Sequence, residues 1–184
     1  MASLPSVRTV TYEDWLEMPE VQDAIEEVVN GEIRIMPAPN WIHSEIVEDL
    51  RDALVPQFDR TQVRVKISDF GLIIRTKPFT SRVPDLAVFI RSSIVERDGY
   101  IHSAPQLVVE VMSPGDTRAE RAAKLDDYAS LGVPEVWVVS PEARTVEVLL
   151  LEEGRYRRSQ ILAEGVLQPK LFPHVRVDVA TIWP

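Results

Sequence analysis

No cysteine occurs in the chain, which excludes disulfide bonds, thiolate metal sites and a cysteine nucleophile. No apolar stretch approaches the length needed to span a bilayer, so no membrane segment is expected. The first residues, Met1–Pro5, lack the charged and apolar regions of a signal peptide, and we therefore expect a cytoplasmic protein. Positive charge is also scarce, with 20 Lys and Arg against 29 Asp and Glu and a net charge of −9. That balance argues against broad electrostatic adhesion to nucleic acid.

The composition is otherwise that of a globular protein. Hydrophobic residues make up 45% and charged residues 27% of the 184 residues, which argues against a disordered or fibrous chain. A chain of this length can bury a sizeable core within one domain. Because repeats, linkers and low-complexity stretches are absent, a single domain is predicted over residues 1–184.

Local signals predict a mixture of helices and strands. Thr11, Asn40 and Thr117 each have the features of a helix N-cap. Asn30-Gly31 lies between two strand-like segments and predicts a β-hairpin. Further strands are predicted at 63–67, 70–74, 83–90, 107–112, 136–139, 145–151 and 156–163. The segment after Pro169 has no clear pattern, and the order of the other elements predicts a mixed α/β (α+β) fold.

Two acidic residues lie in runs that are otherwise apolar. Glu110 is inside Leu107–Met112, and Asp85 opens a similar run within 83–90. Strands buried on both faces of a sheet are typically continuous apolar runs, so an acid in one must be paired, protonated or bound to metal. Mg²⁺ prefers oxygen ligands, usually one or two carboxylates with waters and substrate phosphates. Asp85 and Glu110 are therefore predicted to hold Mg²⁺, which Mn²⁺ can replace, in a phosphodiesterase site.

The helix expected after Thr117 carries two further candidates. Lys124 and Tyr128 are four residues apart and lie on one side of such a helix. Lys124 is predicted to orient or activate the attacking water, with Tyr128 in a supporting role. Alternatively, Tyr128 is a core residue whose hydroxyl is hydrogen-bonded nearby. Glu110, in turn, could form a buried ion pair with Lys124 or Arg121 that is retained for structure alone.

Two residues nearer the N-terminus are predicted to support the same site. Glu27 is in the first hairpin strand, from which it could point into the cavity of the two strand acids. The alternative is an ordinary surface glutamate. His43 lies on the apolar side of the helix that Asn40 caps, where a histidine is either a functional group or a hydrogen-bonded core residue.

Positive charge is concentrated in one segment that leads into Asp85. Between residues 60 and 82 there are six cations and one acid, whereas between residues 11 and 55 there are twelve acids and two cations. The cations are Arg60, Arg64, Lys66, Arg75, Lys77 and Arg82. Arg75, Lys77 and Arg82, being close to Asp85 in sequence, are predicted to contact nucleic acid. The alternative is a solvated strand face without a ligand.

An ordered set of motifs resembles the Uma-two restriction-endonuclease family, from about Thr11 to Leu150. The motifs are Glu27-Val28-Val29-Asn30-Gly31-Glu32, Met36-Pro37-Ala38-Pro39 with His43, Pro84-Asp85-Leu86-Ala87-Val88, residues 104–114, Lys124-Leu125-Asp126-Asp127-Tyr128 and residues 132–139. That family is similar to the PD-(D/E)XK nucleases. The resemblance implies a restriction-endonuclease-like central mixed β-sheet flanked by helices, with Asp85 and Glu110 as metal-binding acids. In the usual motif a lysine lies two residues after the second acid. Here that residue is Met112, and the family pattern carries the lysine's role to Lys124.

These observations lead to two hypotheses from different functional classes. The first is a Mg²⁺-dependent endonuclease that cleaves nucleic acid, with DNA as the expected substrate and a homodimer that brings together two basic segments. The second is a non-catalytic regulatory or interaction module that retains a nuclease-like fold. Uptake of Mg²⁺ or Mn²⁺ with an increase in stability distinguishes them, because a vestigial site would not respond to metal.

Overall fold

The computed structural model describes residues 9–19 and 24–184, and its strands form two six-stranded sheets and a two-stranded ribbon. Met1–Pro5, the segment without signal-peptide features, lies outside the described residues. The central sheet has the order β12-β11-β10-β9-β6-β3. Its strands are β3 (Val63–Ile67), β6 (Leu86–Ile90), β9 (Leu107–Val111), β10 (Glu135–Ser140), β11 (Thr145–Glu152) and β12 (Arg155–Leu162). Strands β9 and β10 are parallel and the other neighbours antiparallel, which confirms the predicted mixed sheet.

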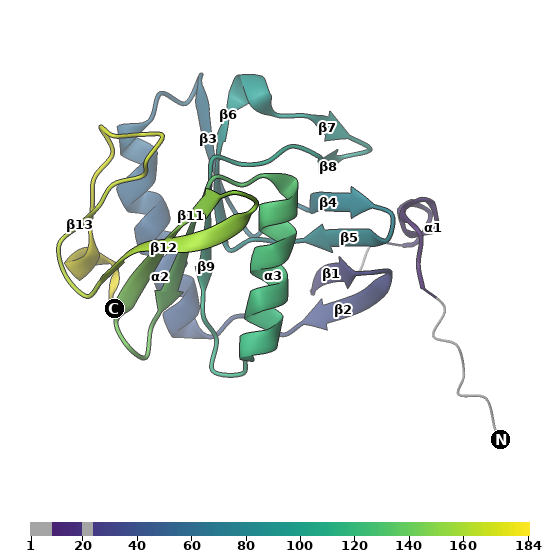
Figure 1. Cartoon of the computed structure of the whole chain (residues 1–184), viewed down its shortest axis with the longest axis horizontal. Helices are drawn as coiled ribbons and strands as arrows, with labels where there is room; N and C mark the ends of the chain where they lie inside the picture. The colour runs from purple at the N-terminus through teal and green to yellow at the C-terminus, as the bar shows by residue number, and fades with distance from the viewer. Residues whose placement is uncertain (1–8, 20–23) are drawn as a thin grey trace.

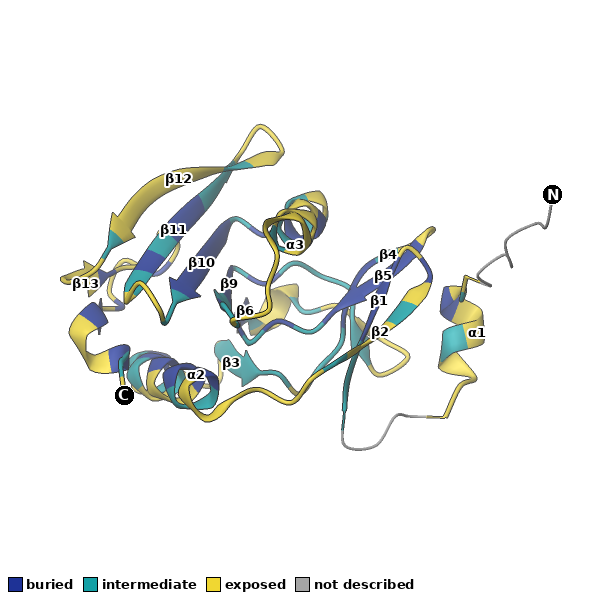
Figure 2. Cartoon of the chain, turned by 90° about the horizontal axis from the view of Figure 1, so that it is seen from below, coloured by how far each residue is buried: buried dark blue, intermediate teal, exposed yellow. Residues whose placement is uncertain are grey.

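Two long helices cover the opposite faces of this sheet (Figure 2). They are α2 (Trp41–Leu54) and α3 (Arg118–Leu131). Side chains alternate between the faces of a strand, so Leu86 and Val88 of β6 belong to the same core cluster as the apolar side of α2. Ala87 and Phe89 belong to the cluster on the other face, which contains Tyr128 of α3. The sheet is therefore buried on both sides, as its apolar runs predicted.

The second sheet has the order β2-β1-β5-β4-β8-β7 and lies on the other side of α3 from the central sheet (Figure 1). Its strands are β1 (Ile25–Val29), β2 (Glu32–Met36), β4 (Leu72–Thr76), β5 (Phe79–Arg82), β7 (Glu96–Arg97) and β8 (Tyr100–Ile101). The predicted hairpin is confirmed, since Asn30 and Gly31 at its turn both have positive φ angles, 52° and 83°. The sequence does not predict β5, nor the β7–β8 hairpin, which lies between the predicted strands at 83–90 and 107–112.

The helix boundaries follow their predicted caps. Thr11 and Thr117 both form capping boxes, at α1 (Tyr12–Leu16) and α3, and Asn40 caps α2. Helix α3 ends at Gly132, whose φ of 89° is the left-handed conformation that favours glycine. Three short 3₁₀ helices complete the helical structure: η1 (Val55–Gln57), η2 (Arg91–Ser93) and η3 (Val179–Ile182).

The C-terminal segment, which showed no clear sequence pattern, packs against α2 and the central sheet. It contains the ribbon strands β13 (Val166–Leu167) and β14 (Val177–Asp178). Its buried core residues are Leu167, Phe172, Val175, Val177, Val179 and Ile182. Glu135 at the start of β10 holds this segment by accepting a hydrogen bond of 2.7 Å from the backbone N–H of Lys170. None of the helices in the described residues has the length and apolar character to cross a membrane.

Candidate active site

Asp85 and Glu110 lie opposite each other on neighbouring strands. Asp85 comes directly before β6, whose first residue, Leu86, pairs with Val109, the residue before Glu110 on β9. Asp85 is fixed by a hydrogen bond of 2.7 Å from the backbone N–H of Val111 to its Oδ2. The two side chains are 17% and 16% exposed, so each carboxylate is largely buried but open to the same space. The predicted pair of acids on adjacent strands is therefore present in the structure.

Helix α3 covers one face of the central sheet and brings the side chains of Lys124 and Tyr128 to Glu110. Glu110 points to the α3 face because its neighbours Val109 and Val111 point to the α2 face. Lys124 Nζ lies 2.7 Å from Glu110 Oε2, and the Tyr128 hydroxyl donates a hydrogen bond to Glu110 Oε1. Lys124 and Tyr128 are one helical turn apart, so α3 presents both along one side. Lys124 and Tyr128 therefore reach the same carboxylate from one side of the helix.

Burial and charge together determine the protonation of this group of residues. Burial raises the pKa of Glu110 to about 7, Lys124 opposes the increase, and Asp85 adds to it. Burial alone would lower the pKa of Lys124, but the carboxylates of Glu110 and Glu27 outweigh it, and the pKa rises above its ordinary value. Burial and the charge of Glu110 raise the pKa of Tyr128 well above 10. Lys124 is therefore a permanent cation, whereas Glu110 exchanges its proton near neutral pH.

Glu27 faces the same group from β1 and is 2% exposed, so it is not an ordinary surface glutamate. Its Oε2 accepts a hydrogen bond of 2.8 Å from Arg82 Nη1. Its Oε1 accepts a hydrogen bond of 3.1 Å from the backbone N–H of Val83 and lies 3.4 Å from Lys124 Nζ. Glu27 is thus beside the site but contacts its cation rather than Asp85 or Glu110.

His43 approaches Asp85 from the first turn of α2. Its Nε2 donates a hydrogen bond of 3.2 Å to Asp85 Oδ2. Burial would lower the pKa of His43, but the hydrogen bond and charge of Asp85 reverse the effect, and the pKa is raised. In the described part of the chain, no group accepts from or donates to the buried Nδ1 of His43. The burial of the ring agrees with a hydrogen-bonded core histidine, and its hydrogen bond to Asp85 agrees with a functional group at the site. Both interpretations of His43 therefore stay open.

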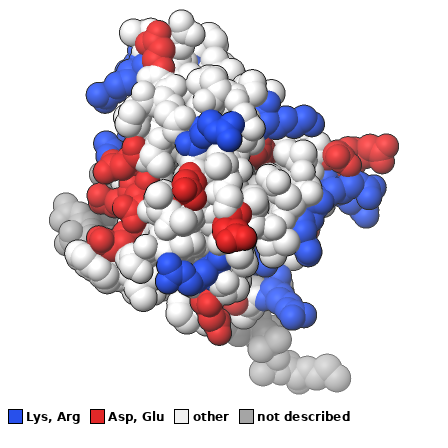
Figure 3. All heavy atoms as spheres, turned by 90° about the vertical axis from the view of Figure 1, so that its left-hand side faces the viewer, with Lys and Arg blue, Asp and Glu red and all other residues white. Residues whose placement is uncertain are grey.

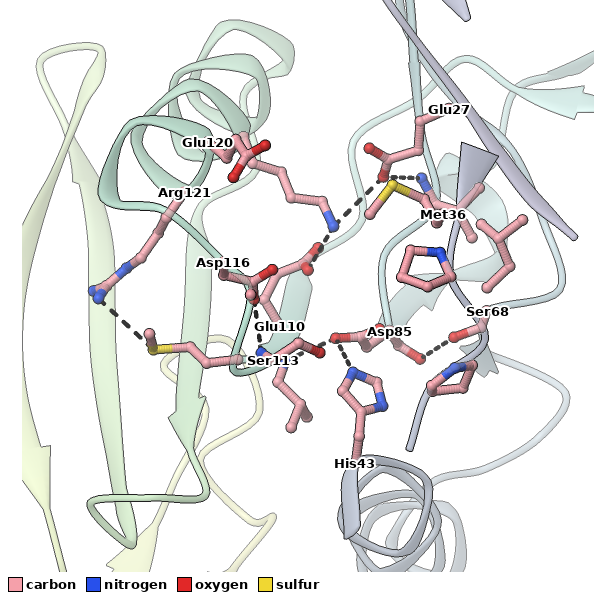
Figure 4. A pocket seen from close by; sticks show the side chains of 18 of the residues that line it. Glu27, Met36, His43, Ser68, Asp85, Glu110, Ser113, Asp116, Glu120 and Arg121 are labelled. Atoms are coloured by element: carbon pink, nitrogen blue, oxygen red, sulfur yellow. Dashed lines mark hydrogen bonds and ion pairs between the residues drawn. The ribbon is translucent and has the colours of Figure 1, made fainter. Parts of the chain in front are cut away.

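These side chains line a cavity of about 600 Å³ between the central sheet, α3 and the segment after β2. Figure 4 shows Asp85 and Glu110 pointing into it, with His43 coming from α2 and Glu27 from the opposite side. An apolar wall is formed by Met36, Pro37, Ala38 and Pro39. A cavity of this size is in the range of small-molecule binding sites.

The three predicted nucleic-acid contacts occupy different environments. Arg82 is only 4% exposed and is hydrogen-bonded to Glu27 and Asp127, so the prediction that it contacts nucleic acid does not fit its position. Arg75 is partly exposed and donates to Asp127 and Asn30. Lys77 is exposed. The buried cluster around Arg82 forms because β5 lies in the interior of the second sheet.

Asp85 and Glu110 would hold a divalent cation of the Mg²⁺ type through carboxylate oxygens, the donors that Mg²⁺ prefers. Asp85 Oδ2 accepts hydrogen bonds from His43 Nε2 and the Val111 N–H, and Glu110 accepts from Lys124 Nζ and the Tyr128 hydroxyl. Among the described residues, Asp85 Oδ1 is the oxygen of this pair that accepts no hydrogen bond. No three His, Asp or Glu side chains in residues 9–19 and 24–184 form a group that could hold a metal ion by themselves. The remaining ligand positions would have to be filled by waters and substrate phosphate, as is usual for Mg²⁺.

Asp127 is the residue of this region that the sequence analysis missed. It is 6% exposed and accepts hydrogen bonds from both Arg75 and Arg82. Helical spacing was the one sequence feature that pointed to Asp127, because it lies three residues after Lys124 and next to Tyr128 on the same helix. Its neighbour Asp126 is exposed, and spacing alone did not separate the two.

Comparisons with known proteins agree with this architecture. The family model Uma2, described as "Putative restriction endonuclease", matches residues 12–180. A crystal structure from Anabaena variabilis, described as "a putative nuclease belonging to DUF820", has a TM-score of 0.76 and 21% sequence identity, covering 94% of this chain and 97% of that one. At that identity the similarity shows the fold, and the predicted restriction-endonuclease-like fold is confirmed. No curated protein matches the chain.

Proposed function

The chain belongs to the Uma2 restriction-endonuclease family, and on this premise we propose that it is a divalent-metal-dependent endonuclease that hydrolyses phosphodiester bonds in DNA. One observation carries the proposal. Asp85, Glu110 and Lys124 come from three separate elements and meet at one cavity, with Lys124 Nζ 2.7 Å from Glu110 Oε2. Buried acids are costly, and their convergence with a cation in an open cavity is typical of a catalytic site.

The residues divide the work as follows. Asp85 and Glu110 would hold Mg²⁺ or Mn²⁺, which when bound polarises the scissile phosphate and lowers the pKa of a water. Lys124 provides a fixed positive charge that orients the attacking water and opposes the negative charge that develops on the phosphate. Tyr128 and the Val111 N–H fix the orientation of Glu110 and Asp85. His43 balances the charge of Asp85 from the other side.

Binding of DNA requires a positively charged surface, and positive charge in this chain is concentrated in the 60–82 segment. The face in Figure 3 carries charges of both signs without a continuous basic area. Duplex binding depends on several Lys or Arg contacts to phosphate. We therefore propose that Lys77 and Arg75 contact the backbone, and that a homodimer brings two copies of the 60–82 segment to one substrate. A cytoplasmic location, where such a nuclease would meet DNA, is part of this proposal.

A specific observation favours the alternative, a non-catalytic module. Lys124 pairs with Glu110 and His43 pairs with Asp85, so each acid already has a counter-charge. Such ion pairs offset the desolvation cost of the two buried carboxylates when no metal is bound. The same contacts also suit a catalytic site, because His43 and Lys124 hold the side chains of Asp85 and Glu110 at the cavity, where both acids would hold the metal.

The deciding experiment is cleavage of supercoiled plasmid with Mg²⁺ or Mn²⁺, using wild type and Asp85→Asn. The expected result is metal-dependent nicking by wild type that is lost in Asp85→Asn. Asp126→Asn, an exposed acid on α3, is the control and should cleave like wild type. Lack of cleavage by wild type, together with the absence of any metal-dependent increase in melting temperature, would establish the non-catalytic module.

A further inference from the structure

Arg82 is an arginine whose whole guanidinium group is used inside the protein. It is 4% exposed and comes from β5. Its Nη1 donates to Glu27 Oε2 at 2.8 Å. Its Nε and Nη2 both donate to Asp127 Oδ2, at 2.9 and 2.7 Å. A buried cation requires such pairing, and the planar fork of arginine allows two carboxylates to be held at fixed positions.

The two carboxylates come from elements that form the walls of the candidate site. Glu27 lies on β1 of the second sheet, and Asp127 lies on α3, one turn from Lys124. Asp127 is held from its other side by Arg75, whose Nη1 is 2.8 Å from Oδ1. Arg82 thereby connects the second sheet to the helix that carries Lys124 and Tyr128. None of the atoms of Arg82 contacts Asp85, Glu110 or Lys124 in the described structure.

Glu27 is the link between Arg82 and the site. One of its oxygens is occupied by Arg82, and the other lies 3.4 Å from Lys124 Nζ. Lys124 is closer to Glu110, at 2.7 Å. Two buried carboxylates thus compete for one ammonium, and Coulomb attraction at these distances is strong in a partly buried site. By binding Oε2 of Glu27, Arg82 holds that carboxylate with its other oxygen 3.4 Å from Lys124, so Glu110 remains the closer partner.

Glu27 also fixes the chain segment that leads to Asp85. Its Oε1 accepts a hydrogen bond of 3.1 Å from the N–H of Val83, two residues before Asp85. Arg82 itself is three residues before Asp85. The residues that hold Arg82 in place therefore influence both Lys124 and the start of β6.

We propose that Arg82 is a positioning residue for this site: by occupying one oxygen of Glu27 and binding Asp127, it directs the Lys124 ammonium to Glu110. The inference rests on the proposed nuclease function and assigns Arg82 a role inside the protein in place of a contact with nucleic acid. It differs from a purely structural role, because its effect on turnover passes through Glu27 and Lys124.

The test compares Arg82→Lys with wild type in steady-state plasmid cleavage with Mn²⁺. Lysine keeps the charge but cannot bind Glu27 and Asp127 in the same fork. Misplacement of a catalytic group by about 1 Å can reduce the rate about 100-fold, so kcat should fall by about that factor. KM should stay within about twofold, because Arg82 is 4% exposed and its guanidinium is bound to Glu27 and Asp127. Arg158→Lys is the control, since Arg158 pairs with Glu147 outside this network.

A double-mutant cycle separates positioning from general loss of stability. In a Glu27→Gln background the charge competing for Lys124 is removed, so Arg82→Lys should reduce kcat much less than in wild type. An equal reduction in both backgrounds, or a wild-type kcat for Arg82→Lys, would overturn the inference. A rise in KM with unchanged kcat would also overturn it and indicate a contact with substrate. If Arg82→Lys does not fold, Asp127→Asn is used instead, because it weakens the hydrogen bonds that hold Arg82 on the side away from Glu27.

Crystal structures of wild type and Arg82→Lys keep the inference testable if wild type cleaves no plasmid. In that case the proposed function fails, while the position of Lys124 can still be measured. We expect Lys124 Nζ to move towards Glu27 in Arg82→Lys, so that it is no longer closer to Glu110. An unchanged position of Lys124 would contradict the positioning role.

Discussion

Lys124 Nζ lies 2.7 Å from Glu110 Oε2, and the two residues are 14 positions apart, on helix α3 and on the preceding strand β9. The nuclease motif that the chain resembles has its lysine two residues after the second acid, and Met112 occupies that position here. Helix α3 therefore supplies the cation that strand β9 lacks. This relationship makes the site residues testable one by one, because each reaches the cavity from its own element.

Metal binding should stabilise the folded protein through Asp85. A ligand at about 100 times its Kd stabilises the native state by about 2.7 kcal/mol, so saturating Mn²⁺ should raise the melting temperature of wild type measurably. Asp85→Asn removes a charged ligand and should abolish the increase. Differential scanning calorimetry with and without Mn²⁺ measures both. An undiminished increase in Asp85→Asn would mean that the metal binds elsewhere.

Lys124→Ala should separate turnover from metal affinity. If Lys124 orients the water without binding the metal, the variant should lose turnover by about 100-fold or more even at high pH, where Glu110 is ionised and Mn²⁺ affinity is retained. Lys124→Arg should not restore turnover, because a planar guanidinium cannot replace a compact ammonium at one point. Plasmid-cleavage rates and calorimetric titrations on the same preparations measure the two effects. Lys170→Ala, which changes an exposed lysine of the C-terminal segment, is the control. Equal cleavage by wild type and Lys124→Ala would remove Lys124 from the mechanism.

The pH dependence of metal affinity should report the raised pKa of Glu110, about 7 in place of 4.5. Below pH 7 the folded protein holds a proton on Glu110 that the metal must displace. Mn²⁺ affinity should therefore increase by up to about tenfold per pH unit up to about pH 7 and level off above it. The stability of the metal-free protein depends on Glu110 in the opposite direction. Between pH 4.5 and 7 the folded state binds more protons than the unfolded state, so the contribution of Glu110 to the free energy of unfolding falls as pH rises. Calorimetric titrations at pH 6, 7 and 8 measure the affinity, and a constant affinity would show that Glu110 is already ionised at pH 6.

Tyr128→Phe should increase the proton affinity of Glu110 further. The Tyr128 hydroxyl donates to Glu110 Oε1, and this bond lowers the pKa of Glu110. Loss of the donor should weaken Mn²⁺ binding at pH 6 more than at pH 8, where Glu110 is ionised in both proteins. The free energy of unfolding should fall by about 1 kcal/mol, the usual contribution of one hydrogen bond. Tyr156→Phe, which removes a buried hydroxyl that donates to the Val133 carbonyl, is the matched control and should leave metal affinity unchanged at both pH values.

The sequence alone determined the features that depend on neighbouring residues. Thr117 caps α3 through Glu120, three residues away, and the Asn30-Gly31 turn needs only the conformational freedom of its own backbone. Glu110 was identifiable as a site candidate because an acid in an apolar run needs a partner wherever the strand lies. Such interactions span a few residues, so the pattern and the structure agree.

Tertiary structure alone decided which charges face each other across the fold. Arg82 was predicted to contact nucleic acid, yet its partners are Glu27 and Asp127, at sequence separations of 55 and 45 residues. The strand that contains Arg82 was missed because its buried residues Thr80 and Ser81 carry no apolar signal. A cation in a basic segment has the same local sequence whether it is solvated or buried. Only the docking of β5 between β1 and β4, with α3 alongside, places Arg82 where two carboxylates surround it.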